Sequence, residues 1–374
     1  MRAIASFCKA LLRDRVLWGT CGLLAVCALL PGIAAFPTYG IDAQREELRQ
    51  SYGNLVDGLD SGAFDTAPSE LKDLLNAKRD ALGTVLEAGD TADFYTSAAQ
   101  VSELDLEGIR LGYVSGDEAL AQAELEYSRG MARNGAIAKA SNAAELDALG
   151  GLTVAIASMP APLWYCVALV LVARTLSLSR AGRLFEAPCL SAPGRCALFL
   201  TPVIACSALC LAAVLAPGFV ADALRNGTGN PNQPITYVVD GEVYVVNLGS
   251  SCVNLIASLM LGAVFLACLA LFLWRVSGSV PASLAGVLVV TVLPLVPVYF
   301  EAQGPFAAVV PFLPSTYLSP AAFLPCAGNP PYQLMTCPVE INPLIGIAIL
   351  AGSSLALAVA SSAVDALSLR RPSC

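Results

Sequence analysis

The 374-residue sequence is 56% hydrophobic and only 13% charged, with a mean hydropathy of +0.67. A composition this apolar is outside the range of soluble globular proteins and indicates a polytopic membrane protein. The sequence contains no histidine, which excludes histidine-dependent catalytic triads and HExxH zinc sites. The net charge of −8 hides a segregation of acidic and basic residues along the chain, and nothing in the pattern indicates nucleic-acid binding.

Residues 1–40 combine a basic start with an apolar run. Met1–Arg15 has apolar residues at helical spacing, which fits an amphipathic helix on the inner membrane surface or, equally, a basic flank that fixes orientation. Val16–Tyr39 is long enough, at about 1.5 Å per residue, to cross a hydrocarbon core of about 30 Å. Ala34 and Ala35 would suit signal-peptide cleavage, but a signal-peptide core has only about 7 to 15 residues. The sequence therefore favours an uncleaved first span.

Residues 41–150 form an acidic region with 21 Asp and Glu against 9 Lys and Arg. Apolar residues recur there every three or four positions, as in Leu71–Leu86, so the region is expected to fold as four or five amphipathic helices. Ser115 and Glu118 have the spacing of a capping box before one of these helices. We expect a helical extracytoplasmic domain.

Residues 151–374 contain five further apolar runs, which with the first make six predicted transmembrane helices. The runs are Thr153–Ala173, Ala197–Val220, Val253–Trp274, Val280–Phe300 and Pro343–Val364. Asp365, at the boundary of the last run, is the only charge associated with them. Carriers driven by protons or ions usually keep ionisable residues inside the bundle, so these uncharged spans favour an external energy source.

The short loops predict the orientation. In a six-span arrangement the inner side holds 11 basic and 3 acidic residues, and the outer side holds 10 basic and 26 acidic residues. Short basic loops remain on the cytoplasmic side, whereas long translocated domains have little influence. The sequence therefore predicts a multi-pass protein of the bacterial plasma membrane with both termini in the cytoplasm.

Two loops on the predicted outer side have features of their own. Ile235–Val246 reads ITYVVDGEVYVV, which predicts a β-hairpin turning at Asp240 and Gly241. Phe306–Leu313 is apolar but too short to cross, so it is either a re-entrant segment or a loop that packs on the bundle. Cys326 and Cys337 follow, and an oxidising exterior would permit a disulfide between them.

Arg174–Arg195, RTLSLSRAGRLFEAPCLSAPGR, is a basic loop between two spans and the main candidate site. Gly182, Leu190, Ser191 and the Pro193-Gly194-Arg195 sequence, followed at once by a span, resemble the cytoplasmic loop of the ABC-2 type transporter permease family. The basic N-terminus, the large outer domain before the second span and Phe312–Leu324 before the last span agree with this resemblance. Leu178 and Ser179 stand where that family usually has an acidic residue.

The resemblance implies the transmembrane subunit of an ATP-driven exporter, which moves an amphiphilic peptide, lipid or drug outward. Its partners would be a separate ABC ATPase subunit, a second permease copy or sister chain, and membrane lipid. The residues expected to couple to the ATPase are Gly182, Arg183, Phe185, Glu186, Leu190, Pro193, Gly194 and Arg195.

Catalysis by this chain is not expected. The sequence has no Walker A loop, no GxSxG elbow and no lysine within a predicted span, so ATP hydrolysis would belong to the partner, and no cofactor or metal site is expected.

The alternative function is a membrane-anchored sensor or scaffold whose acidic domain binds a ligand or partner. The expected fold is all-α and polytopic, with six transmembrane helices, a helical extracytoplasmic domain between the first two and a small exofacial hairpin between the third and fourth.

Overall fold

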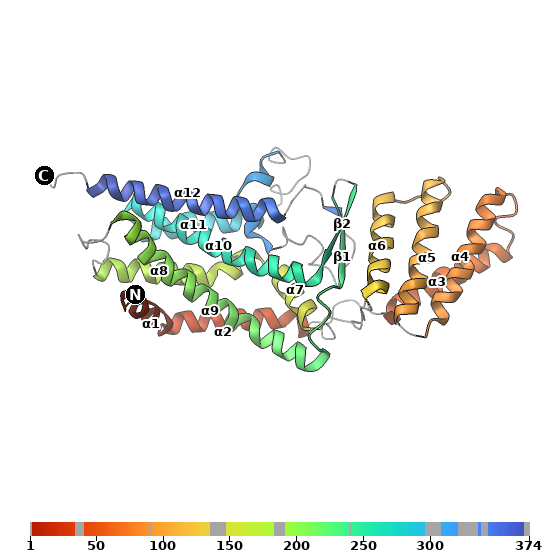
Figure 1. The fold of residues 1–374 in the computed structure, drawn as a ribbon, viewed down its shortest axis with the longest axis horizontal. Helices are drawn as coiled ribbons and strands as arrows, with labels where there is room; N and C mark the ends of the chain where they lie inside the picture. The colour runs from red at the N-terminus through yellow and green to blue at the C-terminus, as the bar shows by residue number, and fades with distance from the viewer. Residues whose placement is uncertain are drawn as a thin grey trace.

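The computed structural model describes residues 2–33, 41–89, 91–134, 147–182, 191–239, 241–295, 308–320, 336–337 and 343–369. The protein is predominantly helical and elongated, with three parts along its long axis (Figure 1). An apolar helix bundle lies at one end, a small sheet lies in the middle, and four helices of the acidic region lie at the other end. The first described helix, residues 2–12, and the end of the last one, residues 343–369, lie at the free end of the bundle, here called the terminal end, and the opposite end is the domain end (Figure 1).

The bundle contains eight helices in its described part, and a single hydrophobic core runs through it. Its buried side chains are almost all apolar, as the composition requires for helices that pack inside a membrane. The helices are α1 (Arg2–Leu12), α2 (Arg15–Ile33), α7 (Ala148–Ser158), α8 (Ala161–Gly182), α9 (Ala192–Asn226), α10 (Leu248–Ser277), α11 (Val280–Val292) and α12 (Pro343–Leu369).

Four described helices, rather than the expected six, are long and apolar enough to cross a membrane: α8, α9, α10 and α12. The described parts of α2 and α11 are shorter apolar helices, Arg15–Ala28 and, with the 3₁₀ turn η3 (Leu293–Leu295), Val280–Leu295. Pro294 lies in that turn, where its missing N–H removes a helical hydrogen bond and ends α11 early.

The predicted span Thr153–Ala173 is divided into two helices. Met159 takes an extended conformation between α7 and α8, as residues before a proline commonly do, and Pro160 cannot continue the helix. The indole of Trp164 donates a hydrogen bond to the carbonyl of Ile156 at 2.9 Å and so joins the two helices across the break. The membrane-crossing helix is therefore Ala161–Leu178, shifted toward the terminal end.

Residues 41–134 fold into the predicted helices, four in the described part: α3 (Ile41–Asp60), α4 (Ser69–Glu87), α5 (Thr91–Arg110) and α6 (Glu118–Asn134). Sequence neighbours pack on one another around a separate core that includes Leu82, Phe94 and Met131. The cap of α6 is Asp117, whose carboxylate accepts the N–H groups of Ala119 and Leu120, and not the predicted Ser115. An aspartate next to the helix start satisfies those donors directly.

The predicted hairpin is confirmed as β1 (Pro234–Val239) and β2 (Glu242–Asn247), paired antiparallel with Val239 opposite Glu242. Gly241 has a φ of 80°, the left-handed conformation that a tight turn requires. A short third strand, β3 (Thr336–Cys337), pairs in parallel with β1. Helix α6 lies against this sheet, and β2 leads directly into α10 (Figure 1).

The segment 308–320, part of the predicted re-entrant loop, packs on the bundle. It forms two 3₁₀ turns, η5 (Val310–Phe312) and η6 (Thr316–Leu318), which contact α12 and, for η6, α10. Tyr317 is buried against Gly346 of α12 and donates a hydrogen bond to the carbonyl of Pro311 at 2.8 Å. Of the two interpretations of the sequence, the described residues favour a packed loop.

Candidate functional site

The basic stretch 174–195 is shorter as a loop than the sequence indicates, because helices enter it from both sides. α8 continues to Gly182, and α9 begins at Ala192. Ser191 is the N-cap of α9 and accepts the N–H of Gly194 at 3.4 Å. Pro193 lies in the first turn, where its missing N–H costs nothing. The Ser-x-Pro-Gly-Arg sequence is therefore the start of a helix.

Arg195 belongs to a buried ionic cluster at the terminal end of the bundle, formed by Arg195 of α9, Arg275 of α10 and Asp365 of α12. The Asp365 carboxylate lies 2.9 Å from an Arg275 guanidinium nitrogen and 3.6 Å from an Arg195 guanidinium nitrogen. Arg195 is 4% and Asp365 3% exposed. We call these three residues the Arg195 cluster.

The Arg195 cluster ties three membrane-crossing helices together through one carboxylate. Buried charges of this kind must remain paired, and removing one partner typically costs about 3–5 kcal/mol. Arg275 is further held over the ring of Trp274, with 4.8 Å between the guanidinium carbon and the ring centroid. The start of α9 therefore cannot move independently of α10 and α12 unless the ion pair between Arg195 and Asp365 breaks, which would leave buried charges unpaired.

A second ion pair holds the other end of the basic stretch. Arg174 of α8 pairs with Asp14, which lies between α1 and α2 and also accepts the N–H of Val16 at 2.8 Å. The Asp14 side chain is 16% exposed and that of Arg174 is 47% exposed, so this pair lies nearer the surface than the Arg195 cluster. Both described ends of the stretch are thus fixed to the bundle by acidic residues from distant parts of the chain, Asp14 between α1 and α2 and Asp365 in α12.

The predicted coupling residues fall into two groups. Gly182 ends α8, and Pro193, Gly194 and Arg195 form the first turn of α9. Arg183, Phe185, Glu186 and Leu190 lie outside the described residues. Arg195 directs its charge into the bundle and toward Asp365, so in this conformation it is placed to hold α9 in position and not to touch a partner.

Sequence reasoning missed the partners of Arg195. The sequence shows Asp365 as the single charge at a span boundary. A carboxylate at such a position usually pairs with a basic residue, so the basic residues expected at the same end of the bundle were the candidates for its partners. Arg275 lies in the last turn of α10 and follows directly after the predicted span Val253–Trp274, so it is one of the 11 basic residues that were counted only for orientation.

The described residues contain no group of three or more Cys, Asp or Glu arranged to hold a metal ion. The predicted disulfide is untested, since Cys326 lies outside the described residues and Cys337 is in β3. No protein-family model, curated protein or solved structure matches this chain.

Proposed function

We propose that this chain is the transmembrane permease subunit of an ABC-2 type exporter, driven by a separate ABC ATPase that docks at the terminal end. In this proposal the terminal end faces the cytoplasm of a bacterial cell and the acidic helical domain lies outside. The substrate is an amphiphile, and the transport unit is a dimer of this chain or of this chain with a sister subunit.

The observation that carries the proposal is the Arg195 cluster. A permease without its own energy source needs a device that passes the movement of a docked ATPase into the membrane helices. The cluster supplies one, because a push on the start of α9 reaches α10 and α12 through the carboxylate of Asp365. The pair between Arg174 and Asp14 connects the other end of the basic stretch to α1 and α2.

Co-purification tests the proposal. The full chain, solubilised in detergent, should co-purify with a soluble ABC ATPase from its own cells, and Arg183→Glu should weaken that complex by removing a charge predicted to face the ATPase. Arg13→Glu is the matched control, because Arg13 is an exposed arginine of α1's flank outside the basic stretch. If no ATPase co-purifies with the chain, and if Arg183→Glu and Arg13→Glu export equally well, the proposed function is wrong.

A second function is favoured by the contact between the acidic region and the sheet. Two side-chain amides bond across this contact: Asn134 at the end of α6 donates to the carbonyl of Asn232 at 3.0 Å, and Asn230 donates to the carbonyl of Asn134 at 3.1 Å. A sensor could use this route, because a ligand that shifts α6 would move β1, β2 and then α10. A chain that binds no ATPase but changes its unfolding temperature with an extracellular ligand would support the sensor.

A further inference from the structure

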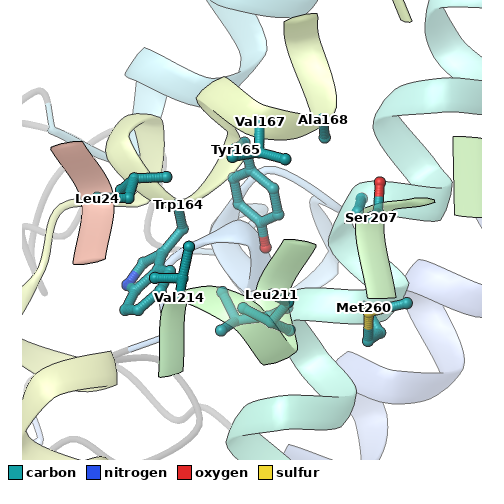
Figure 2. A pocket seen from close by; sticks show the side chains of 11 residues that line it. Leu24, Trp164, Tyr165, Val167, Ala168, Ser207, Leu211, Val214 and Met260 are labelled. Atoms are coloured by element: carbon teal, nitrogen blue, oxygen red, sulfur yellow. The ribbon is translucent and has the colours of Figure 1, made fainter. Parts of the chain in front are cut away.

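The cavity inside the bundle has room for water but not for a larger ligand. It measures about 30 Å³ and lies between α2, α8, α9 and α10, and the unpaired hydroxyls of Tyr165 and Ser207 belong to its largely apolar wall (Figure 2). Two hydroxyls are the minimum number of polar partners that a buried water needs. Hydrogen-bonding groups that a larger partner can use lie on the surface instead, along the free edge of the sheet.

The free edge belongs to β2. In the part of the chain that the structure describes, the strand order is β2-β1-β3, so β2 is bonded to β1 on one side and to no strand on the other. β1 is buried, with Ile235 and Val238 only 1% and 3% exposed, whereas Tyr244 and Val245 of β2 are 39% and 48% exposed. β2 carries no proline, and its described pairing with β1 runs without a bulge. An open edge of this kind is a template for a further strand.

The register of the hairpin determines which backbone groups of β2 face the open edge. Glu242 flanks the two-residue turn opposite Val239, and residues in that position form a hydrogen-bonded pair. In antiparallel strands, residues that bond to the partner alternate with residues that point away from it. Every second residue from Glu242 therefore bonds to β1, and the residues between them point their N–H and C=O groups outward: Val243, Val245 and Asn247.

The sheet lies across the long axis of the molecule. Helix α6 contacts both β1 and β2 and so covers one face of the sheet, whereas Ile235 and Val246, which are paired across the two strands, pack on the core of the bundle. The normal of the sheet is therefore roughly parallel to the long axis, along which α10 and α12 also run (Figure 1).

This placement of the sheet is compatible with a dimer in a membrane. Two identical strands that pair antiparallel are related by a twofold axis perpendicular to their common sheet. Here that axis runs along the membrane-crossing helices, so two copies joined through β2 can span the same membrane in the same orientation. A second copy of the chain is thus an occupant that fits the open edge.

We propose that β2 pairs antiparallel with β2 of a second copy of this chain, with Val245 opposite its counterpart. The two Val245 residues then exchange two hydrogen bonds, and the N–H of each Asn247 donates to the carbonyl of the opposite Val243. The carbonyl of Asn247 is already used, since it accepts the hydroxyls of Ser250 and Ser251. The pairing specifies the dimer of the proposed function and rests on it in that respect, but it requires no ATPase.

Charge complementarity favours this register. Glu242 comes to lie across from Leu248, the first residue of α10 in the other copy. The first turn of α10 has no acidic residue, and its N-cap, Asn247, makes no side-chain capping bond. A carboxylate near the start of a helix is stabilising. The alternative register, with Tyr244 opposite its counterpart, would place Glu242 opposite Val246, whose side chain packs on the bundle.

Disulfide formation in membranes tests the pairing. Membranes that contain the full chain are oxidised with copper phenanthroline, and covalent dimers are measured by non-reducing electrophoresis, with the wild-type chain as the control for its native cysteines. We expect most dimer from Val245→Cys, because the Cα atoms of a directly opposed hydrogen-bonded pair are about 5.5 Å apart. Tyr244→Cys and Val246→Cys would lie about 7–8 Å from their counterparts and should form little more dimer than the wild type.

Removal of one outward N–H is a second test. Val245→Pro deletes an N–H that β1 does not use, and Val245→Thr is the matched control, because it keeps the N–H and the β-branched shape. Analytical ultracentrifugation of the full chain in detergent should show dimerisation at least about tenfold weaker in the proline variant, since two hydrogen bonds of about fivefold each are lost. Hydrogen exchange in residues 234–239 shows whether the hairpin remains intact.

The pairing is wrong if Val245→Cys forms no more dimer than the wild type or less than Tyr244→Cys. It is also wrong if Val245→Pro, with an intact hairpin, dimerises as tightly as Val245→Thr; if the proline disrupts the hairpin, the cysteine variants decide alone. A dimer through Val245 in a chain that binds no ABC ATPase would support the pairing and contradict the proposed function. An ATPase complex without this crosslink would support that function and overturn the pairing.

Discussion

At the scale of single residues, Tyr165 and Tyr317 are both buried tyrosines of the bundle but differ in hydrogen bonding. Tyr317 donates to Pro311, whereas Tyr165 has no protein partner. In detergent we expect Tyr317→Phe to lower the free energy of unfolding by about 0.5–1.5 kcal/mol and Tyr165→Phe to leave it unchanged or raise it. Thermal unfolding of the two variants measures this, and an equal loss in both would contradict it.

Asp147 gives a prediction on pH. It caps α7 by accepting the N–H of Gly150 at 2.7 Å, and burial raises the pKa of its carboxyl above the usual 3.8, although hydrogen bonds from Gly150 and Leu149 act in the opposite direction. A folded pKa above the unfolded one means that this group stabilises the fold more as the pH falls through the folded pKa, and least above it.

Asp147→Asn retains the capping oxygen and removes the buried charge. We expect its unfolding temperature at pH 7 to equal or exceed that of the wild type, with a weaker pH dependence just above pH 3.8. Asp147→Ala, the control, loses the cap and should cost about 1 kcal/mol at any pH. Unfolding curves at several pH values measure this. If Asp147→Asn were less stable than the wild type at pH 7, the buried charge of Asp147 would not be destabilising, and the prediction would be wrong.

At the scale of elements, the Arg195 cluster joins three helices, and its shared carboxylate is the most sensitive position. Asp365→Asn removes the anion between the buried guanidinium of Arg195 and the partly buried one of Arg275, so we expect a loss of about 3–5 kcal/mol in unfolding free energy. Glu118→Gln breaks an exposed pair with Arg110, whose side chains are 57% and 55% exposed, and should cost less than about 1 kcal/mol. Similar losses in both variants would show that the cluster is not a structural tie.

Elements with a strong local signal were predicted correctly, and elements decided by long-range contacts were not. The Asp-Gly turn identified the hairpin, and apolar spacing identified the helices of the acidic region. Pro160 and Pro294 divided or shortened apolar runs whose hydropathy alone suggested full spans. Arg195 looked like a loop residue because its partner, Asp365, is 170 positions away in the sequence, and the lining of the cavity depends on how four helices pack.

At the scale of the whole molecule, the acidic region is connected to the bundle through α6 and the sheet. A Cβ atom at Gly130 of α6 would lie 2.8 Å from the ring of Pro234 at the start of β1. Gly130→Val should therefore push the two apart and increase hydrogen exchange in residues 234–239. Gly53→Val is the control, because a Cβ atom at Gly53 meets nothing within 4 Å. Unchanged exchange in the Gly130 variant would mean that the contact is not tight.

The proposed orientation can be checked on intact cells with a thiol reagent that does not cross membranes. We expect labelling of Cys326 or Cys337 after reduction and none of Cys189 or Cys374, because the predicted outer loop carries the first two. The start of α1 and the end of α12 lie at the terminal end, opposite the acidic region (Figure 1). Labelling of Cys189 from outside would invert the orientation.

Helix α9 has 35 residues and is therefore about 52 Å long, whereas a hydrocarbon core is about 30 Å thick. With its start held in the Arg195 cluster, its last turns, which carry Asp222 and Arg225, extend roughly 20 Å beyond the hydrocarbon at the domain end. The charged headgroups occupy roughly 5–7 Å of that distance, which leaves roughly 13–15 Å, between one and two Debye lengths of about 8 Å at physiological salt. In the proposed orientation, the surface charge of the lipid is therefore largely screened at the acidic helices, so we expect a ligand that binds them to respond more strongly to the ionic strength of the medium than to the proportion of anionic lipid.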